Sequence, residues 1–194
     1  EYNKKNQKLR EIGEIVSNDF KFYQRMFSFK KESEKSYIIR LDFNNSSGRT
    51  NTNLIAVDVS SYKGKKLKGK FRINGDSFRK SVHKISDFLF QSIVGEKSIF
   101  ETEIVFTSDL ASRDGQMIKE LYIMDFDGRN PKRLTFHNEI VISPAISKDK
   151  RFILYSLVKR HVKNSNVSLY VYDRNTQKSR LVSNRRGINS GAIF

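Results

Sequence analysis

The sequence predicts an α+β domain, two helices packed on a small mixed sheet, followed by the beginning of an all-β propeller with two blades. Two observations predict this order. Up to about residue 100, segments with helical periodicity flank segments rich in strand formers, whereas beyond it the chain has only short apolar runs bounded by turn residues. This second half also repeats itself, with a period of about 48 residues.

Two amphipathic helices are expected in the first half. The first covers Gln7 to Tyr23, and its apolar residues recur at steps of three and four: Leu9, Ile12, Ile15, Val16, Phe20 and Tyr23. The second follows a capping residue at Asp76 or Ser77 and ends at Gly95, with one apolar face: Phe78, Val82, Ile85, Leu89 and Ile93.

Three apolar stretches between the helices predict strands. They are Tyr37 to Phe43, Leu54 to Val59 and Leu67 to Ile73, and polar, turn-forming residues separate them. Because the connections are short, we expect an antiparallel meander.

The repeat in the second half consists of short, similar segments that recur in the same order. Leu121 to Asp125 returns as Leu169 to Asp173, and three further segments return in register: 104–107 as 153–156, 133–135 as 180–182, and 143–146 as 190–193. This period is typical of four-stranded propeller blades and favours a propeller over the alternative of a generic β-sandwich. The Asp-rich turn 125–130 would join the two outer strands of a blade, with Gly128 supplying a positive φ. Only two periods fit before Phe194, so we expect an incomplete propeller.

The formal charge of +16 leaves two interpretations open. Such a charge would allow the protein to bind nucleic acid or an anionic membrane. The basic residues are nevertheless spread along the whole sequence and mixed with acids, without a single stripe, and abundant lysine is also typical of a solvated surface. The absence of cysteine excludes disulfides and thiolate metal sites.

No catalytic or metal-binding constellation is expected. The chain has no Gly-x-Ser-x-Gly motif, the sequence of a nucleophile elbow. Asp125-x-Asp127-Gly128 resembles the opening of a calcium loop but lacks the distal glutamate, so a turn with solvated carboxylates is the better interpretation. His83, His137 and His161 lack ligand spacing, and we expect them at the surface. The sequence therefore predicts no enzyme, no cofactor and no metal.

Several segments resemble the TolB family. Glu120-Leu121-Tyr122, the turn 125–130, Arg133-Leu134-Thr135 and 143–147 are similar to its propeller repeats, and 12–20 is similar to its first helix. The resemblance implies an N-terminal α/β domain at 1–100 and two propeller blades at 101–194. It further implies a non-enzymatic, periplasmic scaffold of the Tol-Pal system, acting in envelope integrity, cell division and protein translocation.

The resemblance also indicates which residues would bind partners. The loop 187–192 aligns with a family loop on the face that meets the lipoprotein Pal, and His137-Asn138 would open on the same face. The expected partner-binding residues are His137, Asn138, Ile188, Asn189, Ser190 and Gly191. Ile188 and Gly191 replace a family His and Ala, so altered Pal recognition is expected. TolA, the second partner, engages an N-terminal arm in the family, whereas Glu1 to Lys5 leads directly into the first helix.

A second function class stays open at this point. In it, the chain is a basic domain that binds an anionic polymer or surface, either nucleic acid or acidic lipid. Salt dependence separates the two classes, because phosphate neutralisation weakens steeply with ionic strength and shape-based protein contacts do not.

Overall fold

A computed structural model describes residues 2–26, 37–45, 52–61, 66–74, 78–159 and 166–194. The chain divides into two compact units, Glu1–Thr102 and Glu103–Phe194. Neither described helix has the length and apolar composition needed to cross a membrane. The expected cap of the second helix, at Asp76 or Ser77, and His161 lie outside the described residues.

The first unit contains two helices and one sheet. Helix α1 (Tyr2–Met26) precedes the strands β1 (Tyr37–Asn45), β2 (Thr52–Ser61) and β3 (Lys66–Asn74), and α2 (Phe78–Val94) follows them. Both strand pairs are antiparallel, with Val57 of β2 opposite Leu41 of β1 and Gly69 of β3. The described sheet is therefore wholly antiparallel, as the meander required, and the prediction of a mixed sheet was wrong. Consecutive strands with short connections pair antiparallel because a parallel pair needs a long crossover.

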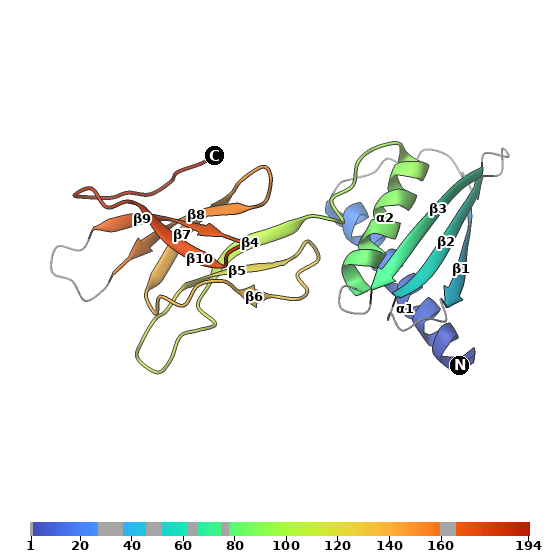
Figure 1. Ribbon diagram of the computed structural model, residues 1–194, viewed down its shortest axis with the longest axis horizontal. Helices are drawn as coiled ribbons and strands as arrows, with labels where there is room; N and C mark the ends of the chain where they lie inside the picture. The colour runs from blue at the N-terminus through green and yellow to red at the C-terminus, as the bar shows by residue number, and fades with distance from the viewer. Residues whose placement is uncertain (1, 27–36, 46–51, 62–65, 75–77, 160–165) are drawn as a thin grey trace. The chain divides into compact units, whose positions relative to one another are not determined.

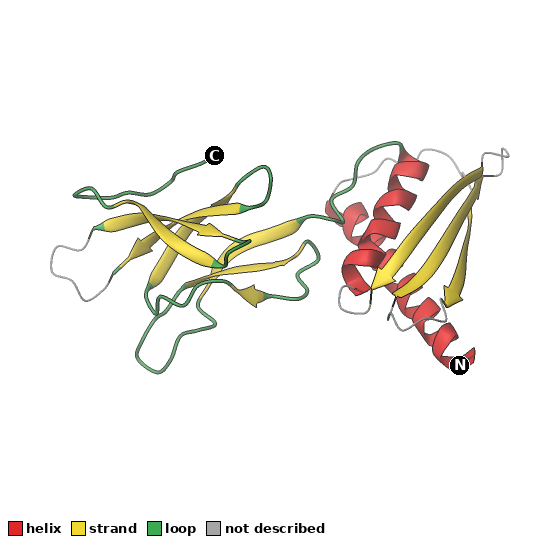
Figure 2. Ribbon diagram, in the orientation of Figure 1, coloured by secondary structure: helices red, strands yellow, loops and turns green. Residues whose placement is uncertain are grey.

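Both helices pack on the same face of this sheet (Figures 1 and 2). Their facing stripes form the core of the unit, with Ile12 and Ile15 from α1 against Val82, Ile85 and Leu89 from α2. These are the residues that the helical periodicity predicted. Gly95, at φ 87°, ends α2 and donates its backbone N–H to the carbonyl of Gln91.

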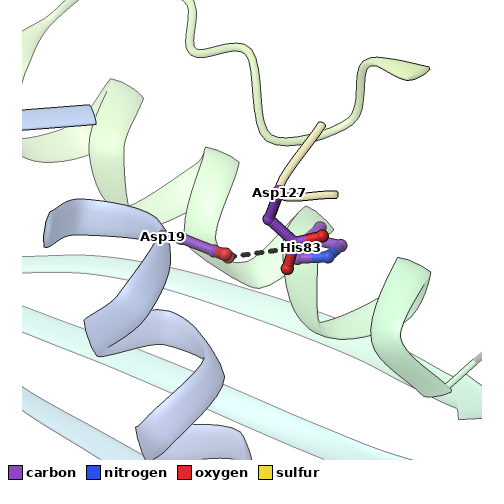
Figure 3. A group of neighbouring side chains, drawn as sticks. All are labelled: Asp19, His83 and Asp127. Carbon is purple, nitrogen blue, oxygen red and sulfur yellow. Dashed lines mark hydrogen bonds and ion pairs between the residues drawn. The ribbon is translucent and has the colours of Figure 1, made fainter. Parts of the chain in front are cut away.

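A buried polar group joins the two helices (Figure 3). Oδ2 of Asp19 lies 2.8 Å from Nδ1 of His83 and accepts a 2.5 Å hydrogen bond from the hydroxyl of Ser86, and all three side chains are buried. The prediction that His83 lies at the surface was therefore wrong. His83 belongs to the face of α2 that meets α1, where Asp19 compensates its polarity. Ser86 and His83 share one acceptor, so the histidine does not take a proton from the serine as in a catalytic triad.

The second unit contains two antiparallel sheets. The first has the order β4 (Glu103–Ser108), β5 (Glu120–Asp125) and β6 (Lys132–Arg133). The second has the order β10 (Lys178–Ser183), β9 (Val167–Asp173), β8 (Phe152–Val158) and β7 (Ile140–Ile146). Their facing sides share one core: Leu121, Ile123, Leu134, Val141, Ile153, Tyr155, Leu157 and Tyr172.

The sequence repeat is also a repeat of contacts. Phe106 of β4 stacks on Tyr122 of β5 at 5.7 Å, and their counterparts Tyr155 and Tyr170 stack at 5.8 Å on β8 and β9. A parallel bridge joins Lys119 to Ile140 at the start of β7, and an equivalent bridge joins Val167 to Ile188. Ile188 therefore occupies the position at which Ile140 begins its strand.

The Asp-rich turn between β5 and β6 has the predicted conformation. Gly128 has φ 83°, and the N–H of Asp125 donates to the carbonyl of Arg129. Asp125 accepts from the side chain of Asn130, and Asp127 accepts from the backbone of Arg129. Both carboxylates thus stabilise the turn itself.

Candidate partner-binding surface

The predicted partner-binding residues His137, Asn138 and Ile188 lie at one end of the two sheets, which we call the loop end, and Asn189, Ser190 and Gly191 follow Ile188 in the chain. At this end, β4 ends beside the start of β5, and β8 ends beside the starts of β7 and β9. Strand β10 also ends here, beside the first residues of β9. The loops at this end include 109–119, 134–139 and 184–188. The opposite end, the turn end, carries the tight turns 126–131, 147–151 and 174–177.

A buried carboxylate fixes the loop that carries His137 and Asn138. Glu120 has no exposed surface, and Oε1 accepts from Nη2 of Arg133 at 2.9 Å and from the backbone N–H of Asn138 at 2.7 Å. Oε2 accepts from the hydroxyl of Thr135 at 2.5 Å. Since a buried charge is stable only when its oxygens are bonded, these contacts define one conformation of the loop.

His137 lies over an aromatic pair of the second sheet. Its Nε2 is 2.8 Å from the hydroxyl of Tyr155, and its ring centroid is 5.7 Å from that of Tyr155 and 5.6 Å from that of Tyr170. Burial lowers the pKa of His137 and outweighs the opposing effect of Glu120. His137 is thus a half-buried, neutral aromatic group at pH 7, and it offers shape and one hydrogen-bonding edge instead of charge.

Phe136 is a surface residue that the sequence analysis missed. It is 70% exposed, and the guanidinium of Arg133 lies 4.5 Å from the centre of its ring. Because Arg133 is itself held by Glu120, this cation–π contact fixes the ring in an exposed position. In the sequence, Phe136 is the one large apolar residue of the polar segment 135–139, and this could have identified it as an exposed residue.

The second predicted segment, 188–191, is anchored by one side chain. The amide nitrogen of Asn189 donates to the carbonyls of Val167 and Arg185, and its oxygen accepts from Ser183. The neighbouring Ile188 is 81% exposed. Ser190 and Gly191 are exposed as well, and Gly191 has φ 71°.

The two predicted segments do not form a single cluster. His137 contacts Tyr155, whereas the carbonyl of Asn189 accepts from the hydroxyl of Ser156. Successive residues of a strand point to opposite faces, so His137 and Asn189 lie on the two faces of the second sheet. Both segments nevertheless lie at its loop end.

The loops of the loop end carry exposed apolar side chains. Leu110, Met117, Phe136 and Ile188 are large, exposed hydrophobic residues of the loop end. The described turns at the other end expose no large hydrophobic side chain, although Ile104, Ile193 and Phe194 are exposed elsewhere in the unit. A fixed, partly apolar surface of this kind is typical of a protein-binding site.

Comparisons with known proteins agree with this architecture. The family model described as TolB beta propeller domain matches residues 90–194. A crystal structure of TolB from Acinetobacter baumannii superposes with a TM-score of 0.64 at 19% identity, and it covers 76% of this chain and 35% of that one. Together these matches confirm the predicted fold class, an α+β domain followed by propeller blades.

Curated relatives share part of the sequence. The chain is 37% identical over 87 residues to the Tol-Pal system protein TolB of Roseobacter denitrificans, covering 45% of this chain and 19% of the relative. It is 30% identical over 131 residues to the protein of that name from Alkalilimnicola ehrlichii, covering 66% of this chain and 29% of the relative. The chain thus spans less than a third of the length of these relatives.

Proposed function

The chain belongs to the TolB β-propeller family, and from this premise we propose that it is a non-enzymatic scaffold of the Tol-Pal envelope system that docks protein partners in the periplasm. Relatives that bear the name of this system support the assignment. In this proposal, residues 1–100 are the N-terminal α/β domain and residues 101–194 are two propeller blades. Its cellular roles would be envelope integrity, cell division and protein translocation.

The observation that carries the proposal is that two exposed apolar side chains project from fixed loops at the loop end. Ile188 and Phe136 project from loops whose backbones are fixed by Asn189 and Glu120. Fixed apolar anchors bind well because little conformational entropy is lost when a partner covers them. His137 and Asn138, with Ile188 to Gly191, would contact a Pal-like lipoprotein. TolA is a second candidate partner, through the first unit.

Charge would steer the encounter without determining the final affinity. Arg113, Lys119, Lys159, Arg185 and Arg186 belong to the loop end, together with three acids of the same loops, Asp109, Asp114 and Glu139. Complementary charge mainly raises the association rate, whereas the buried contacts determine dissociation. We therefore expect the complex to survive moderate salt.

The test is a pull-down of the purified chain from a periplasmic and membrane extract, at low and at high salt, with bound proteins identified by mass spectrometry. Recovery of a Pal-like lipoprotein or TolA at high salt would support the proposal. Recovery of nucleic acid alone, and only at low salt, would overturn it in favour of the anionic-polymer alternative.

A further inference from the structure

Strand β3 of the first unit carries a basic residue at every second position. Its described part contains Lys68, Lys70 and Arg72, all exposed, and Lys66 continues the alternation at the start of the strand. Between them, Gly69 and Phe71 are partly buried, and the ring of Phe71 lies 5.4 Å from that of Phe88 on α2. The cations therefore lie on the sheet face that points away from the helices.

This row is not apparent as a stripe in the linear sequence, because apolar residues interrupt it at each step. In a strand, residues two apart are separated by about 6.8 Å, which is less than the Debye length of about 8 Å at physiological salt. The fields of neighbouring cations therefore add.

The register shows what shares this face of the sheet. Asp58, Ala56 and Leu54 of β2 stand opposite Lys68, Lys70 and Arg72. Further out, β1 places its own residues opposite these three: Arg40, Asp42 and Asn44. None of these register positions is aromatic, whereas single-strand binders use aromatic residues to stack bases. A row of cations without aromatic positions beside it is better suited to an array of phosphates than to stacked bases.

We propose that this face of the β1–β3 sheet, centred on Lys68, Lys70 and Arg72, docks on the surface of an anionic phospholipid membrane. The contact is electrostatic, so the chain lies on the headgroups without inserting an element. Lysine ammonium groups are compact point charges and need no fixed ligand geometry, which agrees with binding to a fluid layer of headgroups. This membrane-binding surface lies on the first unit. The protein partners proposed above would bind at the loop end of the second unit. The two proposals can therefore fail independently.

Vesicle co-sedimentation tests the inference directly. Wild-type chain is titrated with vesicles of phosphatidylcholine alone and of phosphatidylcholine mixed with phosphatidylglycerol. We expect binding to the mixed vesicles only, and a loss of affinity of about fivefold for each cation removed, or about a hundredfold for K68Q/K70Q/R72Q. Raised salt should release the wild-type chain.

A matched variant separates this face from net charge. K148Q/K178Q/R180Q removes the same three charges from exposed positions of the second unit. It should bind mixed vesicles nearly as well as wild type. Equal losses in the two triple variants would show that diffuse charge is responsible and would overturn the inference, as would failure of wild type to bind.

Two further measurements complete the test. The charge-conserving variant K68R/K70R/R72K should retain wild-type affinity, which would show that binding needs positive charge at these positions, and a thermal melt of K68Q/K70Q/R72Q checks that the glutamine variant keeps its fold. A single-stranded oligonucleotide, followed by fluorescence anisotropy, tests the other phosphate-bearing partner. If K68Q/K70Q/R72Q lost oligonucleotide binding but kept vesicle binding, the face would be a nucleic-acid site and the inference would be wrong.

Discussion

Nη2 of Arg133 lies 2.9 Å from Oε1 of Glu120, a carboxylate with no exposed surface. The same oxygen accepts from the backbone of Asn138, and the same guanidinium lies over the ring of Phe136. One buried charge thus determines the position of two residues of the loop end, Phe136 and Asn138, and this makes it the natural site for a first perturbation.

Removal of the Glu120 carboxylate should destabilise the second unit. In Glu120→Ala, Arg133, Thr135 and the N–H of Asn138 lose a common acceptor, and we expect a loss of about 3 kcal/mol in unfolding free energy. Urea denaturation followed by fluorescence measures it. Asp114→Ala, an exposed acid in a neighbouring loop, is the matched control and should change stability little. Equal effects of the two substitutions would show that the network does not stabilise the loop.

The Asp19 carboxylate should have a comparable role in the first unit. Asp19→Ala leaves Nδ1 of His83 and the hydroxyl of Ser86 without their buried acceptor, and we expect a cost of about 2 to 3 kcal/mol. The control is Glu14→Ala, on the exposed side of the same helix. Differential scanning calorimetry of both variants checks this, and an unchanged melting temperature for Asp19→Ala would contradict the description of the buried pair.

Two glycines should respond in opposite directions to the same substitution. A Cβ on Gly69 would lie 2.7 Å from Cε2 of Phe71 and 3.0 Å from Cε1 of Phe88, so Gly69→Ala should destabilise the unit by about 1 to 3 kcal/mol. Gly13, in the middle of α1, has open space around its Cβ position, and Gly13→Ala should stabilise the unit by about 0.5 to 1 kcal/mol. Urea midpoints that shift in the same direction would refute this packing.

His137 should make stability depend on pH in a defined direction. Its pKa in the folded chain lies below the unfolded value of about 6.5, so the unfolded state binds more protons between the two values. The contribution of neutral His137 is therefore complete above about pH 6.5 and is lost as the pH falls through the folded pKa. Hydrogen bonds from Ser147 to Asp149 and from Arg151 to Asp173 lower the pKa of each carboxyl, so these two groups affect stability only at more acidic pH, below about 4.

Thermal melts of wild type and His137→Asn across this range check the dependence. Wild type should lose stability on acidification more steeply than the variant. Parallel curves would mean that His137 does not titrate differently in the folded and unfolded states.

The parts of the structure that follow from local pattern were predictable from sequence. The facing stripes of α1 and α2, and the paired strands around Leu121 and Leu169, were indicated by periodicity and by the internal repeat. Ile188 and His137 both lie at the loop end, and their part in partner binding stays a prediction.

What the sequence could not show depends on contacts between distant residues. His83 appeared to be a surface residue because nothing near it in the sequence compensates a buried imidazole, and its partner Asp19 is on another helix. The role of Glu120 was hidden for the same reason, since its donors follow only after a turn. The basic row on β3 required knowledge of which face the helices cover.

The most direct test of partner docking at the loop end is the affinity of a purified Pal-like lipoprotein domain for wild type, Ile188→Ser and Ile104→Ser, measured by isothermal titration calorimetry. Ile104 is a matched control, because it is a 40% exposed isoleucine of the second unit that pairs with Met124 near the turn end. We predict that Ile188→Ser weakens binding at least about tenfold, because the partner loses a hot-spot anchor. Ile104→Ser should leave the affinity unchanged. Equal affinities for all three proteins would contradict the proposal that the partner binds at the loop end.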